Sequence, residues 1–157
     1  MNDRTQLIDA LETWGPGALR GPVSREEAWA HVRSLSTGHY ENFSVLSRLV
    51  PREMRDDFAS VYAFCRWSDD LGDETGAGES ARARSLELLS WWREGLRGCL
   101  DSAQREADGG TVRHPVYVAL RETIERRGLS GVPFHHLIDA FEQDQRVTEY
   151  ETWDQLL

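Results

Sequence analysis

Apolar residues recur along most of this chain with the three- and four-residue spacing of a helix. Residues at that spacing share one helix face, so each run predicts an amphipathic helix. The runs extend from Ser24 to Gly38, from Pro51 to about Asp73, from Glu79 toward Asp108, from His114 to Gly128 and from Pro133 onward. No stretch shows the sustained alternation of β-branched and polar residues that is typical of strands. The sequence therefore predicts an all-α helical bundle.

Residues with specific roles at helix ends support these boundaries. Ser24 and Glu27 have the spacing of a capping box, and Pro51 suits the first turn of a helix. Gly128 is placed to end the helix that follows His114.

The first 23 residues differ from the rest of the chain. They contain one short amphipathic candidate, followed by the helix breakers Gly15-Pro-Gly17 and Gly21-Pro22. The apolar positions of this candidate are Leu7, Ile8, Leu11 and Trp14. We expect residues 1–23 to form a flexible N-terminal arm and residues 24–157 to form the helical domain.

The predicted helix that ends near Asp73 combines an apolar stripe with acidic residues. Seven side chains fall within about a third of its circumference and are expected to form its buried face. They are Met54, Phe58, Tyr62, Cys65, Arg66, Asp69 and Asp73. Asp69 and Asp73 are one turn apart, roughly 5–6 Å, and both lie at the negative end of the helix dipole. This arrangement is unfavourable unless a cation is bound.

Mg²⁺ is the cation that best fits two carboxylates at this spacing. It prefers oxygen ligands and is commonly held by one or two carboxylates together with substrate phosphates. Arg66, on the same face, is placed to contact a diphosphate or to orient the carboxylates. Zinc fits less well, because His135 and His136 are adjacent and point to different faces of a helix. A solvated helix end without a metal is the competing interpretation.

Other polar residues have simpler interpretations on their own. His39 and Asn42 fit loop or helix-cap positions, and Asp144 fits either a solvated or an inward-facing position. Charged residues of the helix after His114 fit a solvated surface. They are Arg121, Glu122, Glu125, Arg126 and Arg127.

Composition narrows the classes of partner. The 157 residues carry a net charge of −9, which argues against a general binder of nucleic acid or of anionic membranes. No apolar run approaches the ~18 residues of a transmembrane segment. The N-terminus lacks the layout of a signal peptide, so a cytoplasmic protein is expected. Cys65 and Cys99 have no metal-type spacing and are expected to be reduced thiols in the core.

Four segments of the chain form a recognisable series. They are His39-Tyr-Glu-Asn-Phe-Ser-Val45, Tyr62-Ala-Phe-Cys-Arg-Trp-Ser-Asp-Asp-Leu-Gly-Asp-Glu74, His114-Pro-Val-Tyr-Val-Ala-Leu120 and Phe141-Glu-Gln-Asp-Gln-Arg-Val-Thr-Glu-Tyr150. In this order they resemble the squalene/phytoene synthase family, over about residue 24 to Leu157. The Glu-Asn-Phe and Asp-Gln-Arg-Val-Thr pieces look most like the bacterial hydroxysqualene synthases of hopanoid biosynthesis. Family members are longer and carry a second acidic motif further on, so the resemblance covers an N-terminal part whose closing helices are absent.

The resemblance implies an isoprenoid synthase-type bundle in which Mg²⁺ ions bridge acidic motifs and a substrate diphosphate. It implies catalytic roles for Asp69, Asp73 and Tyr62, and metal binding by Asp69, Asp73 and Asp144. The residues expected to bind substrate are His39, Asn42, Phe43, Arg66, Phe141 and Gln145.

The expected reaction is Mg²⁺-dependent conversion of presqualene diphosphate to hydroxysqualene with release of diphosphate. Head-to-head condensation of prenyl diphosphates such as farnesyl diphosphate, giving squalene or phytoene, is the nearest alternative. A non-catalytic helical scaffold or truncated remnant is an alternative from another class. The expected partner is a prenyl diphosphate, with no nucleic acid; a peripheral membrane contact for the apolar product and the oligomeric state are left open.

Overall fold

The computed structural model of the chain describes residues 3–19, 21–38, 49–73, 75–101 and 113–147. Within these ranges every regular element is a helix, which confirms the predicted all-α fold. The elements are α1 (Asp3–Trp14), α2 (Arg25–Gly38), the 3-10 turn η1 (Arg52–Met54), α4 (Arg55–Asp73), α5 (Glu79–Leu100), α7 (Pro115–Arg127) and α8 (Val132–Arg146).

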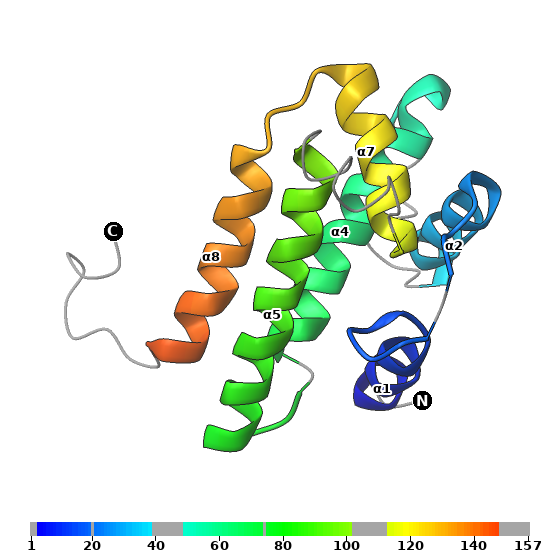
Figure 1. Cartoon of the computed structure of the whole chain (residues 1–157). Coiled ribbons are helices and arrows are strands. Elements are labelled where there is room, and N and C mark those ends of the chain that lie inside the picture. Colours follow the sequence, from blue (N-terminus) through cyan, green and yellow to red (C-terminus); the bar gives the residue numbers. More distant parts are fainter. Residues whose placement is uncertain (1–2, 20, 39–48, 74, 102–112, 148–157) are drawn as a thin grey trace.

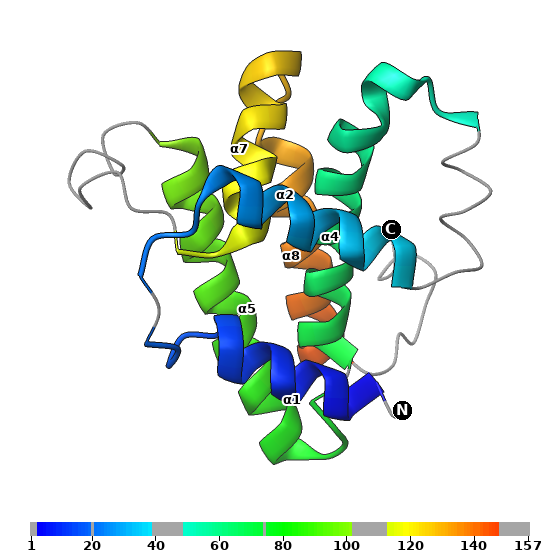
Figure 2. The same ribbon diagram turned by 90° about the vertical axis from the view of Figure 1, so that its right-hand side faces the viewer.

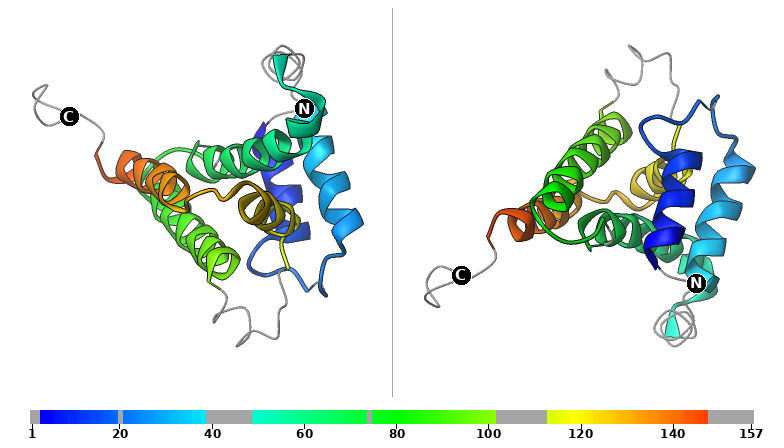
Figure 3. Two further views of the ribbon diagram at one scale, coloured as in Figure 1. Left: turned by 90° about the horizontal axis from the view of Figure 1, so that it is seen from above. Right: turned by 90° about the horizontal axis from the view of Figure 1, so that it is seen from below.

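Helix α4 is the centre of the bundle, and it contacts α1, α2, α5, α7 and α8 (Figure 1). Helices α5 and α8 pack against each other and against α4 on one side of the molecule, and α2 and α7 do so on the other (Figure 3). Figure 2 shows α1 and α2 running across the longer helices. The bundle therefore consists of two three-helix groups that share α4.

Local signals place the helix ends where the sequence predicts them. The Ser24 Oγ accepts a hydrogen bond from the Glu27 N–H at 3.1 Å, as in the predicted N-cap of α2. Pro115 occupies the first turn of α7, and Gly128 ends that helix in the left-handed conformation with φ 64°. A residue with a side chain is disfavoured at this φ, so glycine is the suitable C-cap.

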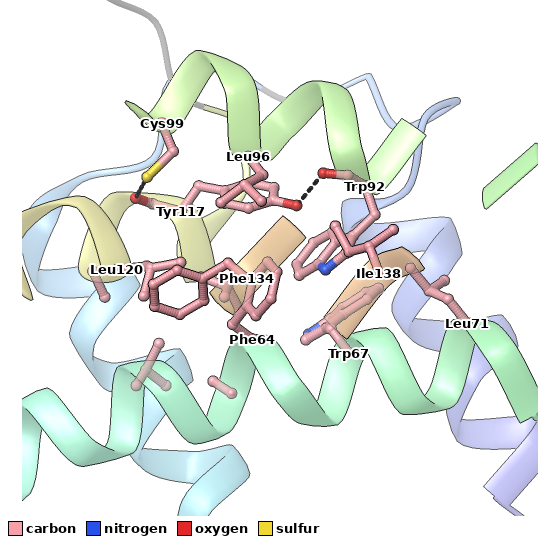
Figure 4. Close-up of a cluster of buried hydrophobic side chains, with 14 of the residues drawn as sticks. Phe64, Trp67, Leu71, Trp92, Leu96, Cys99, Tyr117, Leu120, Phe134 and Ile138 are labelled. Atoms are coloured by element: carbon pink, nitrogen blue, oxygen red, sulfur yellow. Dashed lines mark hydrogen bonds between the residues drawn. The ribbon is translucent and has the colours of Figure 1, made fainter. Parts of the chain in front are cut away.

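An aromatic cluster fills the space where α4, α5, α7 and α8 meet (Figure 4). The Trp92 ring stacks on Phe64 and on Trp67, with both centroid distances at 5.5 Å. Two buried polar groups of the cluster have partners inside it. The Trp92 Nε1–H donates to Ser68 Oγ at 3.0 Å, and the Tyr117 hydroxyl donates to the Trp92 carbonyl. Burial of Trp92 and Tyr117 therefore leaves no cost from an unpaired indole or phenol group.

His114 joins this aromatic cluster as the N-cap of α7. Its Nδ1 accepts the Val116 N–H at 3.3 Å, and its ring lies edge-on to Trp67 and Trp92. Burial, assisted by the nearby His31, lowers the pKa of His114 well below its ordinary value of 6.5. The neutral ring is the form that can accept a hydrogen bond at Nδ1, so capping and burial favour the same protonation state.

The buried face of α4 is not the predicted one. The core-facing stripe carries Phe64, Trp67 and Leu71. The predicted stripe, which runs from Met54 to Asp73, is half-buried or exposed. The stripe with Phe64 and Trp67 offers a larger apolar area, whereas burying the predicted one would remove the charges of Arg66, Asp69 and Asp73 from water.

Helix α1 confirms the short amphipathic segment but does not behave as a loose arm. Leu7 is 5% exposed and belongs to the core cluster, and Leu11 and Trp14 pack against that cluster. This part of the predicted arm therefore lies on the bundle. Both cysteines are free thiols, as expected, with Cys99 buried and Cys65 half-buried.

Candidate functional site

The last two turns of α4 concentrate negative charge. Asp69, Asp70 and Asp73 lie there, and Arg66 lies one turn earlier. The Arg66 guanidinium forms ion pairs with Asp70 at 2.7 Å and with Asp69 at 3.4 Å. Among the described residues, Arg66 therefore pairs with two of these three carboxylates, at the end of the helix where the dipole is also negative.

Asp73 shows the electrostatic effect of this imbalance most clearly. Burial raises the pKa of Asp73 above its ordinary value of 3.8, and the charges of Asp69 and Asp144 raise it further. Asp144 comes from α8, so two helices bring the other two predicted metal ligands within electrostatic range of Asp73. A carboxylate destabilised in this way gains from a nearby cation.

These residues fit only part of a magnesium site. Within the described ranges, no three His, Cys, Asp or Glu side chains lie close enough together to hold a metal ion. Asp69, Asp73 and Asp144 therefore do not enclose an ion by themselves. Two carboxylates that face outward from one helix do fit Mg²⁺ when phosphate oxygens and water complete its octahedron. The arrangement is that of an open site that needs an anionic ligand.

Arg66 also has a hydrogen-bond donor that an anion could use. Its side chain is 21% exposed, and its buried Nε–H has no hydrogen-bond acceptor among the described residues. A buried guanidinium donor without an acceptor is unfavourable, and a phosphate oxygen would satisfy it. Arg66 lies between the carboxylates and the half-buried part of the α4 surface, and its predicted diphosphate contact stays a prediction.

Phe141 and Gln145 lie at the same end of the bundle, on α8. The Phe141 ring packs so closely on α4 that a Cβ at Gly72 would lie 2.9 Å from its Cδ1. The Gln145 Nε2–H donates to the Gly72 carbonyl at 3.1 Å. Both residues hold α8 on α4, and their predicted substrate contacts stay a prediction.

The other predicted pocket residues are only partly described. Tyr62 is half-buried, and together with Phe58 it packs against the edge of the core. Burial raises the pKa of the neighbouring Cys65 thiol, and the charge of Asp69 raises it further, so this apolar strip continues into the acidic end. His39, Asn42 and Phe43 lie outside the described residues.

The sequence interpretation missed a second charged site, at the other end of α4. Asp57 accepts hydrogen bonds from both Arg126 and Arg127, and from the Thr123 hydroxyl at 3.3 Å. The Asp57 side chain is only 8% exposed. Arg126 and Arg127 lie on the solvated surface, as predicted, but the prediction missed that their guanidinium groups pair with a buried carboxylate. The spacing contained a signal, because Asp57 shares a helix face with Phe64 and so requires a buried partner.

Glu122 is also more than a surface charge. Its carboxylate accepts from Arg25 at 2.9 Å and from the Trp29 indole N–H at 3.2 Å. These contacts tie α7 to the first turns of α2. No sequence spacing indicates a pairing between residues so far apart in the chain.

Comparison with known proteins gives the class to which this fold belongs. The structure is similar to the crystal structure of the squalene synthase HpnC from Alicyclobacillus acidocaldarius, with a TM-score of 0.67 and 41% sequence identity over 86% of this chain and 46% of that chain. The fold is therefore that of an isoprenoid synthase of the squalene synthase type. A sequence model of the squalene/phytoene synthase family matches residues 36–157. The chain belongs to the squalene/phytoene synthase family.

Individual relatives include both reaction types of the family. A hydroxysqualene synthase from Zymomonas mobilis is 35% identical over 123 residues, which are 76% of this chain and 37% of that protein. A phytoene synthase from Arthrospira platensis is 28% identical over 138 residues, 88% of this chain and 41% of that protein. The chain thus spans about two-fifths of the length of these relatives. None of the described helices is long and apolar enough to cross a membrane.

Proposed function

We propose that this chain supplies the first acidic half of a Mg²⁺-dependent site for a prenyl diphosphate, in an enzyme that converts presqualene diphosphate to hydroxysqualene. The observation that carries the proposal is the unneutralised end of α4, where Asp69 and Asp73, with Asp144 nearby, face a single arginine. Membership of the squalene/phytoene synthase family and the 41% identity to a squalene synthase support this choice of substrate class.

Each residue has a distinct task in this proposal. Asp69, Asp73 and Asp144 would hold the metal together with oxygens of the substrate, and Arg66 would donate from Nε to a diphosphate oxygen. Bound Mg²⁺ would neutralise charge on the leaving diphosphate. Tyr62 and Phe141 would line the pocket for the apolar chain, where aromatic faces stabilise positive charge that develops after the diphosphate departs.

Head-to-head condensation of two prenyl diphosphates is the second candidate, and the phytoene synthases among the relatives favour it. Both reactions need the same diphosphate contacts, so the acidic end of α4 does not distinguish between them. Their products do: hydroxysqualene comes from the first reaction, and squalene or phytoene from the second.

Binding is the first test. We expect a non-hydrolysable farnesyl diphosphate analogue to bind weakly to the 157-residue chain in the presence of Mg²⁺, measured by calorimetry. Asp69→Asn combined with Asp73→Asn should abolish this binding, and the matched change Asp56→Asn should leave it intact. Binding that is equal with and without Mg²⁺, or in the double variant, would favour a non-catalytic scaffold.

Product analysis is the second test. We expect no turnover from the chain alone, since an incomplete cavity admits water. A chimera in which residues 1–157 replace the matching part of the Zymomonas mobilis enzyme should form hydroxysqualene from presqualene diphosphate. A chimera that only condenses farnesyl diphosphate would contradict the hydroxysqualene assignment and support the second candidate.

A further inference from the structure

The carbonyl of Gly72 accepts hydrogen bonds from two different helices. Ser85 Oγ of α5 and Gln145 Nε2 of α8 each donate to it at 3.1 Å. Gly72 is one of the last four residues of α4, whose carbonyls have no partner within the helix. It directly precedes Asp73 and follows Asp69 by three residues. Both donors therefore act on the turn that carries the predicted metal ligands.

Ser85 is itself held in a fixed orientation. It is fully buried, and its Oγ lies 2.6 Å from Thr75 Oγ1. The Thr75 hydroxyl also donates to the Ala81 carbonyl at 3.2 Å, and either hydroxyl can be the donor between Ser85 and Thr75. The hydrogen bonds of Ser85 and Thr75 fix the start of α5 against the end of α4.

Gln145 links two acidic turns at once. Asp144 is its neighbour in α8, and Asp73 is the neighbour of its acceptor Gly72 in α4. The close packing of Phe141 on Gly72 leaves no room for a side chain at that position. One hydrogen bond at a tight helix contact therefore sets the relative placement of Asp73 and Asp144.

We propose that Gln145 and Ser85 are positioning residues for the carboxylates of the acidic end of α4. The inference rests on the proposed metal and diphosphate site. Two donors on one carbonyl also reduce the negative partial charge at the helix end where Asp69 and Asp73 must approach a common cation. Carboxylates held in place in this way lose less conformational entropy on binding.

The test measures metal affinity, which a merely structural role would leave unchanged in a folded variant. Mn²⁺ with inorganic diphosphate serves as the probe, followed by electron paramagnetic resonance on the 157-residue chain. Gln145→Met keeps the side-chain length and removes the donor, and Ser85→Ala removes the other donor. Gln143→Met, an exposed position on the same helix, is the matched control. Circular dichroism verifies that each variant is folded under the conditions of the titration.

We expect Gln145→Met and Ser85→Ala each to weaken Mn²⁺ binding about 5- to 10-fold, and Gln143→Met to change it less than twofold. If one of the two variants does not fold, the other decides alone. Wild-type affinity in the folded variants would overturn the positioning role while leaving the proposed function intact, provided that Asp69→Asn with Asp73→Asn still abolishes binding. Absence of any Mn²⁺ binding that depends on Asp69 and Asp73 in the wild-type chain would overturn the proposed function, and the positioning role with it.

Discussion

At the two ends of α4, the pKa values of the carboxyl groups Asp57 and Asp73 are shifted in opposite directions. At the N-terminal end, burial alone would raise the pKa of Asp57, but hydrogen bonds and charge from Arg126 and Arg127 outweigh burial and hold it below the ordinary 3.8. At the C-terminal end, burial and the charges of Asp69 and Asp144 raise the pKa of Asp73. The helix dipole favours an acid at the first end and disfavours it at the second.

This difference separates a structural acid from a candidate ligand-binding one. Asp57 has its partners within the chain, and they join α4 to α7. Asp73 lies near the like charges of Asp69 and Asp144, which the described residues neutralise only in part, through the Arg66–Asp69 pair. A charged group that the fold leaves uncompensated is a better candidate for ligand binding than one that is merely buried.

The largest expected effect comes from removing the structural acid. Asp57→Ala removes the acceptor that Thr123, Arg126 and Arg127 share, and we expect the free energy of unfolding to fall by roughly 2–3 kcal/mol. Urea unfolding followed by circular dichroism measures this. Asp56→Ala is the matched control. Its pair with Arg33 is about half exposed, so a loss of less than about 1 kcal/mol is expected. Equal losses in the two variants would contradict the difference between buried and exposed acids.

The next effect concerns the tight contact at the acidic end. In Gly72→Ala the new methyl would collide with the Phe141 ring, at 2.9 Å from Cδ1. Overpacking costs about 1–3 kcal/mol, and the higher helix propensity of Ala relative to Gly offsets up to ~1 kcal/mol of this cost. We expect a net loss of roughly 1–2 kcal/mol in urea unfolding. Gly98→Ala, where a Cβ meets no described atom within 4 Å, should instead stabilise the chain. A neutral Gly72→Ala would show that α8 is not held tightly on α4.

The pH dependence of stability should have opposite signs at the two ends. Between the lowered pKa of Asp57 and 3.8, the unfolded chain binds more protons, so stability rises with pH and is lost on acidification through that window. Between 3.8 and the raised pKa of Asp73, the folded chain binds more protons, so stability falls as pH rises. Urea unfolding at several pH values from 2.5 to 7 should show the first slope reduced in Asp57→Asn and the second removed in Asp73→Asn. If Asp57→Asn and Asp73→Asn showed the same dependence of stability on pH, the assignment of the two slopes to Asp57 and Asp73 would be contradicted.

The smallest expected effect is a gain in the free energy of unfolding. Asp73→Asn removes a like charge one turn from Asp69 at an unfavourable helix end, so we expect the free energy of unfolding to rise by a few tenths of a kcal/mol at pH 7. Thermal unfolding of the two proteins side by side measures this. A clear loss of stability would mean that Asp73 has a structural partner, as Asp57 does.

Local signals allowed most of the fold to be predicted from the sequence. Ser24, Pro115 and Gly128 act at helix ends through contacts with residues close to them in the chain. The buried face of α4 was mispredicted, because two stripes on that helix are apolar enough to be buried. The larger apolar area of the stripe with Phe64 and Trp67, and its contacts with Trp92 and Tyr117 of other helices, decide between them.

The candidate site was predictable to the extent that its residues lie on one helix. Asp69 and Asp73 follow from spacing, and so does Arg66. The roles of Ser85 and Gln145 depend on a backbone carbonyl that belongs to a different helix, and side-chain patterns contain no information about such an acceptor. The same holds for the pairing of Asp57 with Arg126 and Arg127, nearly seventy residues later in the chain.

The central position of α4 has a consequence for synthesis. Its last residue, Asp73, is made well before α8 is complete at Arg146, although α8 covers part of its surface. At about 5–20 residues per second, the ribosome needs roughly 4–15 s to add the intervening residues. Phe64, Trp67 and Leu71 have no complete core to enter during that time. The nascent chain is therefore expected to need chaperone protection at this stage, well before the carboxylates next to these residues can have a function.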